Sequence, residues 1–441
     1  MADIKLPEEG TPKDKLLQQM EDLKSDDANW KEGRTWSLVY YAGEEINQVI
    51  KEAYMSFFHL NALNPMAFPS LRKFESEIVA MTASLLGGNK ECAGSVTSGG
   101  TESILLGVKT ARERARAEKP EIEQPEAIVP VTVHPAFEKA FHYLGVKPIR
   151  IPVDDGFRAD VKAAREAVSE NTILMVGSAP AYPHGVIDPI PELAEIAAER
   201  DISFHVDSCL GGFMLPFIRE LGYPVPEFDF NVPGVTSISA DLHKYGYAAK
   251  GASTIIHRNS ELRKYQFFVY PDWPGGLFGS PTMTGTRPGG AIAAAWAILN
   301  YLGKNGYLEL AELTMKTAKR LMEGVESIPG LYILGEPDMT VFAFSSDDYN
   351  IYAIGEAMES RGWQLDRQQD PASLHLMATP THANIVDEFI EDLKTSVEDV
   401  KAGKVKETEG MVAMYGMMGT ISDRKMVNDF ILDFLDQLLR V

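Results

Sequence analysis

The sequence predicts an α/β protein: a large domain built on a mainly parallel sheet, followed by a smaller C-terminal α/β domain. From about residue 95 to 260, short apolar runs bounded by Gly, Pro and Asp alternate with amphipathic segments, which is typical of βαβ units. After about residue 305, further apolar runs stand between longer helical patterns. The predicted organisation is a helical arm at 1–60, the large domain at 61–305 and the small domain at 306–441.

The arm is expected to contain one or two helices, because its apolar residues recur at helical spacing. The two stripes are formed by Leu16, Leu17, Met20 and Leu23, and by Ile46, Val49, Ile50 and Tyr54. Another helix is expected to begin at about Ser70 and to end at Gly87-Gly88. Its apolar stripe consists of Leu71, Phe74, Ile78, Met81 and Leu85.

Six strands are expected in the large domain, at AIVPVTV, KPIRIPV, TILMVG, ISFHVD, VTSISA and ASTIIH. In the small domain we expect strands at YILG, TVFAF and LHLMA, with helices at 306–327, 384–402 and 424–440. Polar residues that directly follow parallel strands lie at the carboxyl edge of the sheet, where open α/β sheets bind their ligands. Polar residues that directly follow the predicted strands are therefore candidate site residues.

The composition limits which binding partners and which cellular compartment are expected for this protein. The 441 residues have a formal net charge of -21 and no run of Lys or Arg, which argues against nucleic acid and anionic membrane surfaces. Cys92 and Cys209 give neither a disulfide framework nor a metal-ligand spacing, so we expect a reducing compartment and no metal site. The N-terminus lacks a signal-peptide core, and no segment approaches the length of a membrane span. A soluble cytoplasmic protein is expected.

The turn SVTSGGTES, residues 95–103, precedes an amphipathic segment and is a candidate phosphate site. Glycines let backbone amides approach an anion, and the N-terminus of the following helix adds a partial positive charge. The simpler interpretation is a capping turn with Thr101 as the N-cap residue. Taken alone, the turn favours the simpler interpretation.

Two further strand ends carry candidate residues. Asp207 ends ISFHVD and could hold a proton on a buried ring nitrogen, or it could be a turn aspartate. His134 follows AIVPVTV and could stack on a planar ring, although a lone histidine is more often structural. His184 lies in a Pro- and Gly-rich loop, which favours an ordinary turn, and Cys209 is expected to be a small packed residue.

The segment SADLHKYGYAAKG, residues 239–251, places Lys244 and Lys250 close together in an otherwise acidic chain. A lysine becomes a good nucleophile at neutral pH when it is desolvated or lies near another cation, and a phosphate needs a fixed positive partner. A lysine after a strand, combined with Asp207 and the glycine turn, supplies the three contacts that a pyridoxal phosphate enzyme needs. Each signal alone is weak, but their order together favours this cofactor.

The chain resembles the pyridoxal phosphate enzymes of the aspartate aminotransferase fold, fold type I. Within these it is most similar to the group II decarboxylase branch and its sphingosine-1-phosphate lyase family. The resemblance covers nearly all of the chain after about residue 35. It is carried by TSGGTES, HPAFEKAFHYLGV, PAYPHGVIDPI, HVDSCLGGF, SADLHKYGYAAKG, YPDWPGGL, SPTMTGTRPGG and AMYGM, among which HKYGYxxKG and YPDWPGG are specific to the lyases.

The resemblance implies pyridoxal 5'-phosphate as the cofactor and assigns its contacts. Lys244 would be the Schiff-base lysine, His134 would stack on the pyridine ring, and Asp207 would pair with the ring nitrogen. Cys209 would pack under the opposite face of the ring. The positions that match cofactor-phosphate contacts are Gly100, Thr101 and His243, joined by Thr286 from a second subunit of a homodimer.

The resemblance also implies a phosphorylated sphingoid substrate, whose C2 to C3 bond is cleaved to an aldehyde and phosphoethanolamine. The positions that match substrate-phosphate contacts are Tyr40, Tyr182, Lys250 and Tyr415. Asn64 stands where the family has a phosphate-binding histidine, and an amide donates a hydrogen bond but no charge. The general base stays open among Lys244, His184 and a phosphate oxygen. The alternatives are an amino-acid decarboxylase and a catalytically silent scaffold protein.

Overall fold

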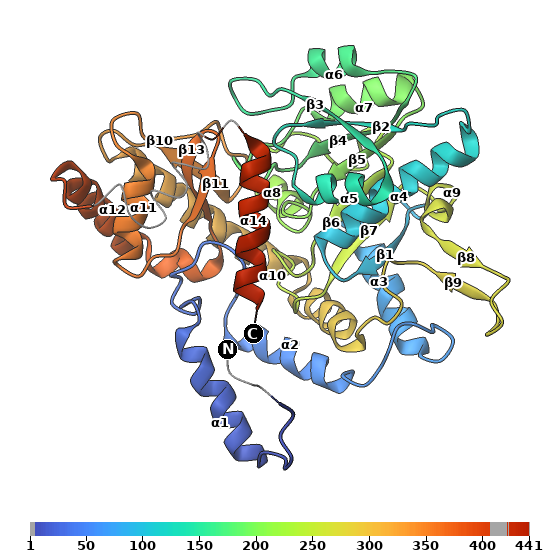
Figure 1. Cartoon of the computed structure of the whole chain (residues 1–441), viewed down its shortest axis with the longest axis horizontal. Coiled ribbons are helices and arrows are strands. Elements are labelled where there is room, and N and C mark those ends of the chain that lie inside the picture. Colours follow the sequence, from blue (N-terminus) through green and yellow to red (C-terminus); the bar gives the residue numbers. More distant parts are fainter. Residues whose placement is uncertain (1–4, 406–420, 422, 441) are drawn as a thin grey trace.

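The computed structural model describes residues 5–405, 421 and 423–440, and its central element is a seven-stranded sheet (Figure 1). The strand order is β1-β7-β6-β5-β4-β2-β3, and β7 is antiparallel to both of its neighbours while all the other pairs are parallel. The strands are β1 (Ala93–Thr97), β2 (Glu126–Pro130), β3 (Lys147–Ile151), β4 (Thr172–Ser178), β5 (Ser203–Asp207), β6 (Ser237–Ala240) and β7 (Ser253–His257). The predicted α/β class with a mainly parallel sheet is confirmed.

Helices cover both faces of this sheet, because the side chains of its buried strands alternate between two cores. On β2, Ile128 belongs to the larger core and Ala127 and Val129 to the other, where Phe137 and Phe141 pack. All six strands predicted in this domain are present, and β1 is an additional one. The surrounding helices are α4 (Gly100–Glu118), α5 (Ala136–Leu144), α6 (Val161–Ala167), α7 (Ile190–Glu199), α8 (Leu215–Glu220) and α9 (Ser260–Arg263).

The small C-terminal unit contains an antiparallel sheet in the order β10-β11-β13-β12. Its elements are β10 (Tyr332–Ile333), β11 (Val341–Ser345), α11 (Ile351–Glu359), β12 (Asp366–Gln369), β13 (Ala372–Met377) and α12 (Val386–Lys401). The core includes Phe342, Phe344 and Phe389 together with Trp36, whose ring stacks on His382 at 4.2 Å. A segment from the N-terminal arm therefore completes the core of this unit.

A long helix, α10 (Gly289–Glu326), connects the large and small units. It includes the expected helix at 306–327 but begins much earlier, and it contains one non-helical residue, Gly303, with φ 54°. The expected helices at 384–402 and 424–440 correspond to α12 and α14 (Arg424–Leu439). The domain boundary placed at residue 305 lies inside α10.

The N-terminal helices are α1 (Lys13–Leu23), α2 (Glu44–Ser56) and α3 (Pro69–Leu85), as the apolar stripes predict. Helix α2 packs on α10. A two-stranded hairpin, β8 (Phe268–Tyr270) and β9 (Phe278–Ser280), extends from the large unit (Figure 1). Short 3-10 helices lie at η1 (Lys24–Asp26), η2 (Lys264–Gln266) and η3 (Pro380–Asn384). Within the described ranges, no helix is long and apolar enough to cross a bilayer.

Candidate active site

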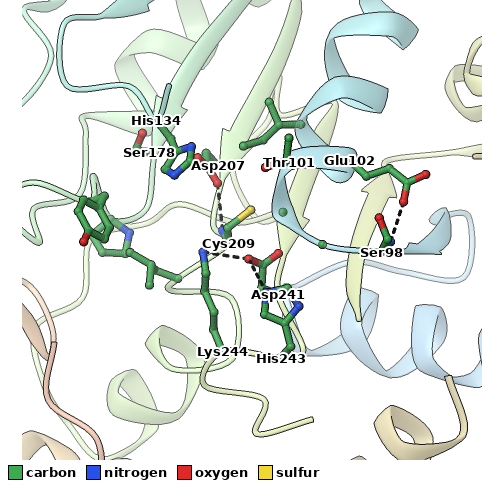
Figure 2. Close-up of a pocket in the computed structure, with 16 residues that line it drawn as sticks. Ser98, Thr101, Glu102, His134, Ser178, Asp207, Cys209, Asp241, His243 and Lys244 are labelled. Atoms are coloured by element: carbon green, nitrogen blue, oxygen red, sulfur yellow. Dashed lines mark hydrogen bonds and ion pairs between the residues drawn. The ribbon is translucent and has the colours of Figure 1, made fainter. Parts of the chain in front are cut away.

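A cavity of about 340 Å³ lies at the carboxyl ends of the parallel strands, next to the N-terminus of α4 (Figure 2). A second, outer cavity of about 770 Å³ shares His134, Tyr182, His243 and Lys244 with the first. The predicted cofactor residues that line the inner cavity are Gly100, Thr101, His134, Asp207, Cys209, His243 and Lys244. The outer cavity adds Tyr40 and Lys250. The fold thus brings together most of the residues that the sequence singles out.

Neighbouring strand ends explain how Asp207 and Lys244 reach one cavity. Strands β5 and β6 pair in parallel, with Asp207 opposite Ser239, so the residues that follow both strands leave the sheet at the same edge. The Asp207 carboxylate accepts hydrogen bonds from the Cys209 amide at 3.1 Å and from the Ser239 hydroxyl at 3.2 Å. These bonds hold a buried carboxylate in one orientation at the cavity wall.

Lys244 pairs with Asp241, a residue that the sequence interpretation did not single out. The Lys244 Nζ atom lies 2.9 Å from Asp241 Oδ2, and Asp241 is 1% exposed. Burial opposes the charge on the ammonium, but the Asp241 carboxylate offsets this effect, so the pKa of Lys244 lies above its ordinary value. Lys244 is therefore a protonated amine held by a buried anion.

The glycine turn before α4 fits a phosphate group. Gly99 is the residue before the helix and Gly100 its first residue, so Thr101 lies inside the first turn and is not the N-cap. A Cβ atom on Gly100 would lie 2.7 Å from Asp241 Oδ2 and 3.0 Å from Cys209 Sγ, so a side chain there would clash. The His243 Nδ1 atom is buried beside this turn and has no hydrogen-bond partner among the described residues. The free amides of the helix N-terminus and this imidazole nitrogen suit an anion with several oxygen atoms.

Glu102 fixes the shape of this turn from the opposite side. Its Oε2 atom accepts a hydrogen bond from the Ser98 amide at 2.7 Å, and its Oε1 atom accepts bonds from the amides of Met283 and Thr284 at 2.8 and 3.2 Å. The residues that follow the β8–β9 hairpin are thereby tied to the phosphate turn.

His134 and Cys209 are suited to contact a ring without exchanging protons. The His134 Nδ1 atom accepts a hydrogen bond from the Ala136 amide at 3.1 Å, which places the proton on Nε2, and burial lowers the pKa of this imidazole. Burial raises the pKa of the Cys209 thiol well above its ordinary value. The first side chain stays a neutral ring and the second a neutral thiol, as expected for packing residues.

The outer cavity presents a cation without an acidic partner. The Lys250 Nζ atom lies 4.9 Å from the centre of the Tyr40 ring, and no carboxylate among the described residues forms an ion pair with it. The protein around the ammonium displaces water and, with the charge of Lys244, lowers the pKa of Lys250 to about 8. The Tyr182 hydroxyl donates a hydrogen bond to Asp366 Oδ2 at 3.0 Å. This group of side chains suits an anionic ligand.

Four predicted residues are not among the described residues that line these two cavities. Asn64 lines neither cavity and accepts hydrogen bonds from the amides of Met66 and Ala67. Thr286 is also outside both cavities and accepts a bond from the Asn61 side chain at 3.3 Å. Tyr415 lies outside the described residues.

His184 is the fourth, and its position is incompatible with its candidacy as general base. It is 1% exposed, its ring stacks on Phe157 at 3.9 Å, and it lines neither cavity. Burial, followed by the influence of His375, lowers the pKa of His184 to about 4. The His184 ring is therefore a neutral core residue. No substrate bound in these cavities could reach it.

Sequence interpretation missed two acidic residues of the site for different reasons. Asp241 directly follows the strand VTSISA, so the strand-end argument identifies it as a candidate. Asp366 lies in β12, whose sequence DRQQ has no apolar alternation and gives no strand signal.

Comparisons with known proteins place the chain in a family. Residues 1–347 match the pyridoxal-dependent decarboxylase conserved domain. The chain is 48% identical to the sphingosine-1-phosphate lyase of rice over 430 residues, which cover 96% of this chain and 79% of the rice protein. It is 44% identical to sphingosine-1-phosphate lyase 1 of the rat, over 98% of this chain and 76% of the rat protein.

Solved structures agree with this placement. The sphingosine-1-phosphate lyase of Burkholderia pseudomallei superposes with a TM-score of 0.88 at 42% identity and covers 91% of this chain and 94% of its own. A glutamate decarboxylase of Lactobacillus brevis superposes with a TM-score of 0.79 at 20% identity, which shows the fold alone.

The fold and the cavity define a pyridoxal phosphate enzyme of fold type I. The chain belongs to the pyridoxal-dependent decarboxylase family, in the branch of the sphingosine-1-phosphate lyases. Its cofactor is pyridoxal phosphate, and the glycine turn, the unpartnered His243 nitrogen and the buried lysine fit that group.

Proposed function

We propose that this protein is a pyridoxal phosphate-dependent aldehyde-lyase that cleaves the C2 to C3 bond of sphingosine-1-phosphate-like long-chain base phosphates. The products are a long-chain aldehyde and phosphoethanolamine. The structural observation that carries this proposal is Lys250, a cation in the outer cavity that is separate from the cofactor-phosphate turn and has no acidic partner among the described residues. The relatives that match nearly the whole of this chain bear the name of this activity, which supports the same substrate class.

The cofactor contacts follow from the inner cavity. When bound, pyridoxal phosphate supplies an electron sink for a developing carbanion. Lys244 would hold it covalently, and the Asp207 carboxylate would keep the ring-nitrogen proton in place. His134 would cover one face of the ring, while the α4 amides, Thr101 and His243 would hold the phosphate.

Substrate orientation is assigned to the outer cavity. Lys250 and the hydroxyl groups of Tyr40 and Tyr182 would bind the substrate phosphate, so that the C2 to C3 bond stands across the plane of the cofactor ring. A base must remove the proton of the C3 hydroxyl. Lys244 is the candidate whose nitrogen lies in the cavity, and a phosphate oxygen of the bound molecules is the other.

A homodimer with shared sites is part of the proposal. Thr286 and Asn64 lie outside their own chain's cavities, and they are neighbours in space because Asn61 contacts Thr286 and Leu63 lies beside Gly285. The adjacent hairpin exposes apolar side chains, among them Phe268, Val269 and Leu277, at 54%, 70% and 88%. Such a surface is suited to a second subunit that receives Thr286 and Asn64 in its site.

The shared site has its own test in mixed dimers. A chain with Lys244→Ala and a chain with Thr286→Ala should restore activity in one of the two sites when they are mixed, because that site receives both intact residues. No restoration, with mass measurement confirming mixed dimers, would overturn the shared site.

The function is tested with purified, cofactor-loaded protein. Dihydrosphingosine-1-phosphate should give aldehyde and phosphoethanolamine in equal amounts, and Lys244→Ala should give neither. Tyrosine, glutamate and aspartate, tested separately, should release no carbon dioxide. Carbon dioxide without aldehyde would overturn the lyase proposal in favour of an amino-acid decarboxylase. Covalent cofactor binding without any product would favour the scaffold protein.

A further inference from the structure

Asp241 is a buried carboxylate at the floor of the inner cavity that the proposed reaction does not yet use. Its Oδ2 atom lies 2.9 Å from Lys244 Nζ and 3.7 Å from His243 Nε2 (Figure 2). Neither carboxylate oxygen has a well-aligned hydrogen bond among the described residues, although both are fully buried. A buried carboxylate is costly unless a charge compensates it, so Lys244 is the main reason that Asp241 stays ionised.

The carboxylate is anionic in this setting. Burial alone would raise the pKa of Asp241, but the charges of Lys244 and then His243 hold it below its ordinary value. The effect is mutual, because Asp241 in turn stabilises the ammonium of Lys244.

Other ionisable groups do not duplicate this contact. The ionisable side chains that line the two cavities around Lys244 include Asp207 at the end of β5, Cys209 after β5, His134 after β2, Tyr182 after β4, and His243 and Lys250. Among the described residues, Asp241 is the acidic side chain within ion-pair distance of Lys244 Nζ. Its removal would leave the ammonium in a desolvated site that also faces Lys250 and His243.

We propose that Asp241 is a positioning residue that keeps Lys244 protonated and fixed at the cavity floor until the cofactor arrives. Attack on an aldehyde carbon requires the neutral amine, so one proton has to leave Nζ for solvent water before the bond from nitrogen to carbon forms. The aldehyde oxygen then leaves as water with the two remaining protons of Nζ, so that atoms and charge balance. The inference rests on the proposed use of Lys244, and it does not depend on which substrate follows.

The test measures the rate at which Lys244 binds pyridoxal phosphate as a function of pH, in cofactor-stripped protein. The rate is followed by absorbance, and the bond is then reduced with borohydride and located by peptide mass. In the unmodified protein the rate should rise with pH up to a high midpoint. In Asp241→Asn the midpoint should fall, because a lysine that loses a contacting carboxylate becomes easier to deprotonate, and the rate below the midpoint should increase about tenfold or more.

Two further variants distinguish the loss of the carboxylate charge from a defect in folding. Asp241→Glu keeps the charge and should retain a high midpoint, while Asp241→Ser removes the charge in a smaller side chain and should reproduce the fall. The midpoint does not depend on the fraction of folded protein, so a variant that folds poorly still reports it. A uniform slowing of Asp241→Asn and Asp241→Ser with the midpoint unchanged would overturn the inference. Absence of label on Lys244 in the unmodified protein would instead overturn the proposed use of that lysine.

Discussion

The Tyr182 hydroxyl donates a hydrogen bond to Asp366 at 3.0 Å, and this bond joins the large unit to β12 of the small unit across the outer cavity. His375 supports the same tyrosine from behind. The two rings stack with their centres 4.3 Å apart, and His375 Nε2 donates to the Tyr182 carbonyl at 2.9 Å. Burial lowers the pKa of His375 to about 4, so this ring stays neutral at physiological pH. Tyr182 is therefore held on both sides in the place assigned to the substrate phosphate.

Removing the Asp366 carboxylate should change substrate binding more than turnover. The single proton of the Tyr182 hydroxyl is bound by Asp366, so in Asp366→Ala it becomes free to be donated to the substrate phosphate. One hydrogen bond contributes about 0.5–1.5 kcal/mol, so KM for the phosphorylated substrate should fall roughly 2- to 13-fold. Asp347→Ala is the matched control, because it breaks the Tyr332 to Asp347 hydrogen bond of 2.9 Å on the exposed surface. Steady-state kinetics of both variants provide the measurement, and an equal change in both would contradict the role of Asp366.

Lys250 should make substrate capture sensitive to alkaline pH. The pKa of this ammonium is lowered to about 8, and a lysine is charged below its pKa, so kcat/KM should fall as pH rises through about 8. The arginine of Lys250→Arg keeps its charge throughout this range, so the fall of kcat/KM should occur at a higher pH in this variant. If the fall occurs at the same pH as in the unmodified protein, the titrating group is the substrate amine or another residue.

Asp207→Asn should preserve the fold and remove most turnover. The amide oxygen can still accept the hydrogen bonds from the Cys209 amide and the Ser239 hydroxyl, but it carries no charge to keep the ring nitrogen protonated. We expect kcat to decrease about 100-fold or more. The melting temperature and covalent cofactor binding are measured beside activity. Near-normal turnover would remove Asp207 from this role.

Gly100→Ala should selectively impair the binding of the cofactor. The added methyl group would lie 2.7 Å from Asp241 Oδ2 and 3.0 Å from Cys209 Sγ, in the turn assigned to the phosphate. We expect the Kd for pyridoxal phosphate to rise by at least about tenfold, since inserting a methylene into a packed site commonly costs about 1–3 kcal/mol. Binding of pyridoxal, which lacks the phosphate, should change less. A similar loss for both compounds would place the defect outside the phosphate turn.

The apolar pattern predicted the sheet well because its central strands are buried on both faces. The run TILMVG is almost entirely apolar, and it lies in the middle of the sheet as β4, beside the equally buried β5. The strand β12 escaped prediction because its sequence DRQQ lies at the edge of an antiparallel sheet, where polar side chains are tolerated. The β8–β9 hairpin is short and exposed, so no alternation between a core and solvent marks it.

The sequence by itself determined six strands of the large sheet, the positions of Asp207 and Lys244 at or after strand ends, and the resemblance to a family. Only the tertiary structure decided which polar residues share a cavity: it brought Asp241 to Lys244, Asp366 to Tyr182, and placed His184 in the core. The physical reason is that local patterns report propensity and burial along one element, whereas pairing and desolvation depend on distances between elements that the chain brings together only on folding.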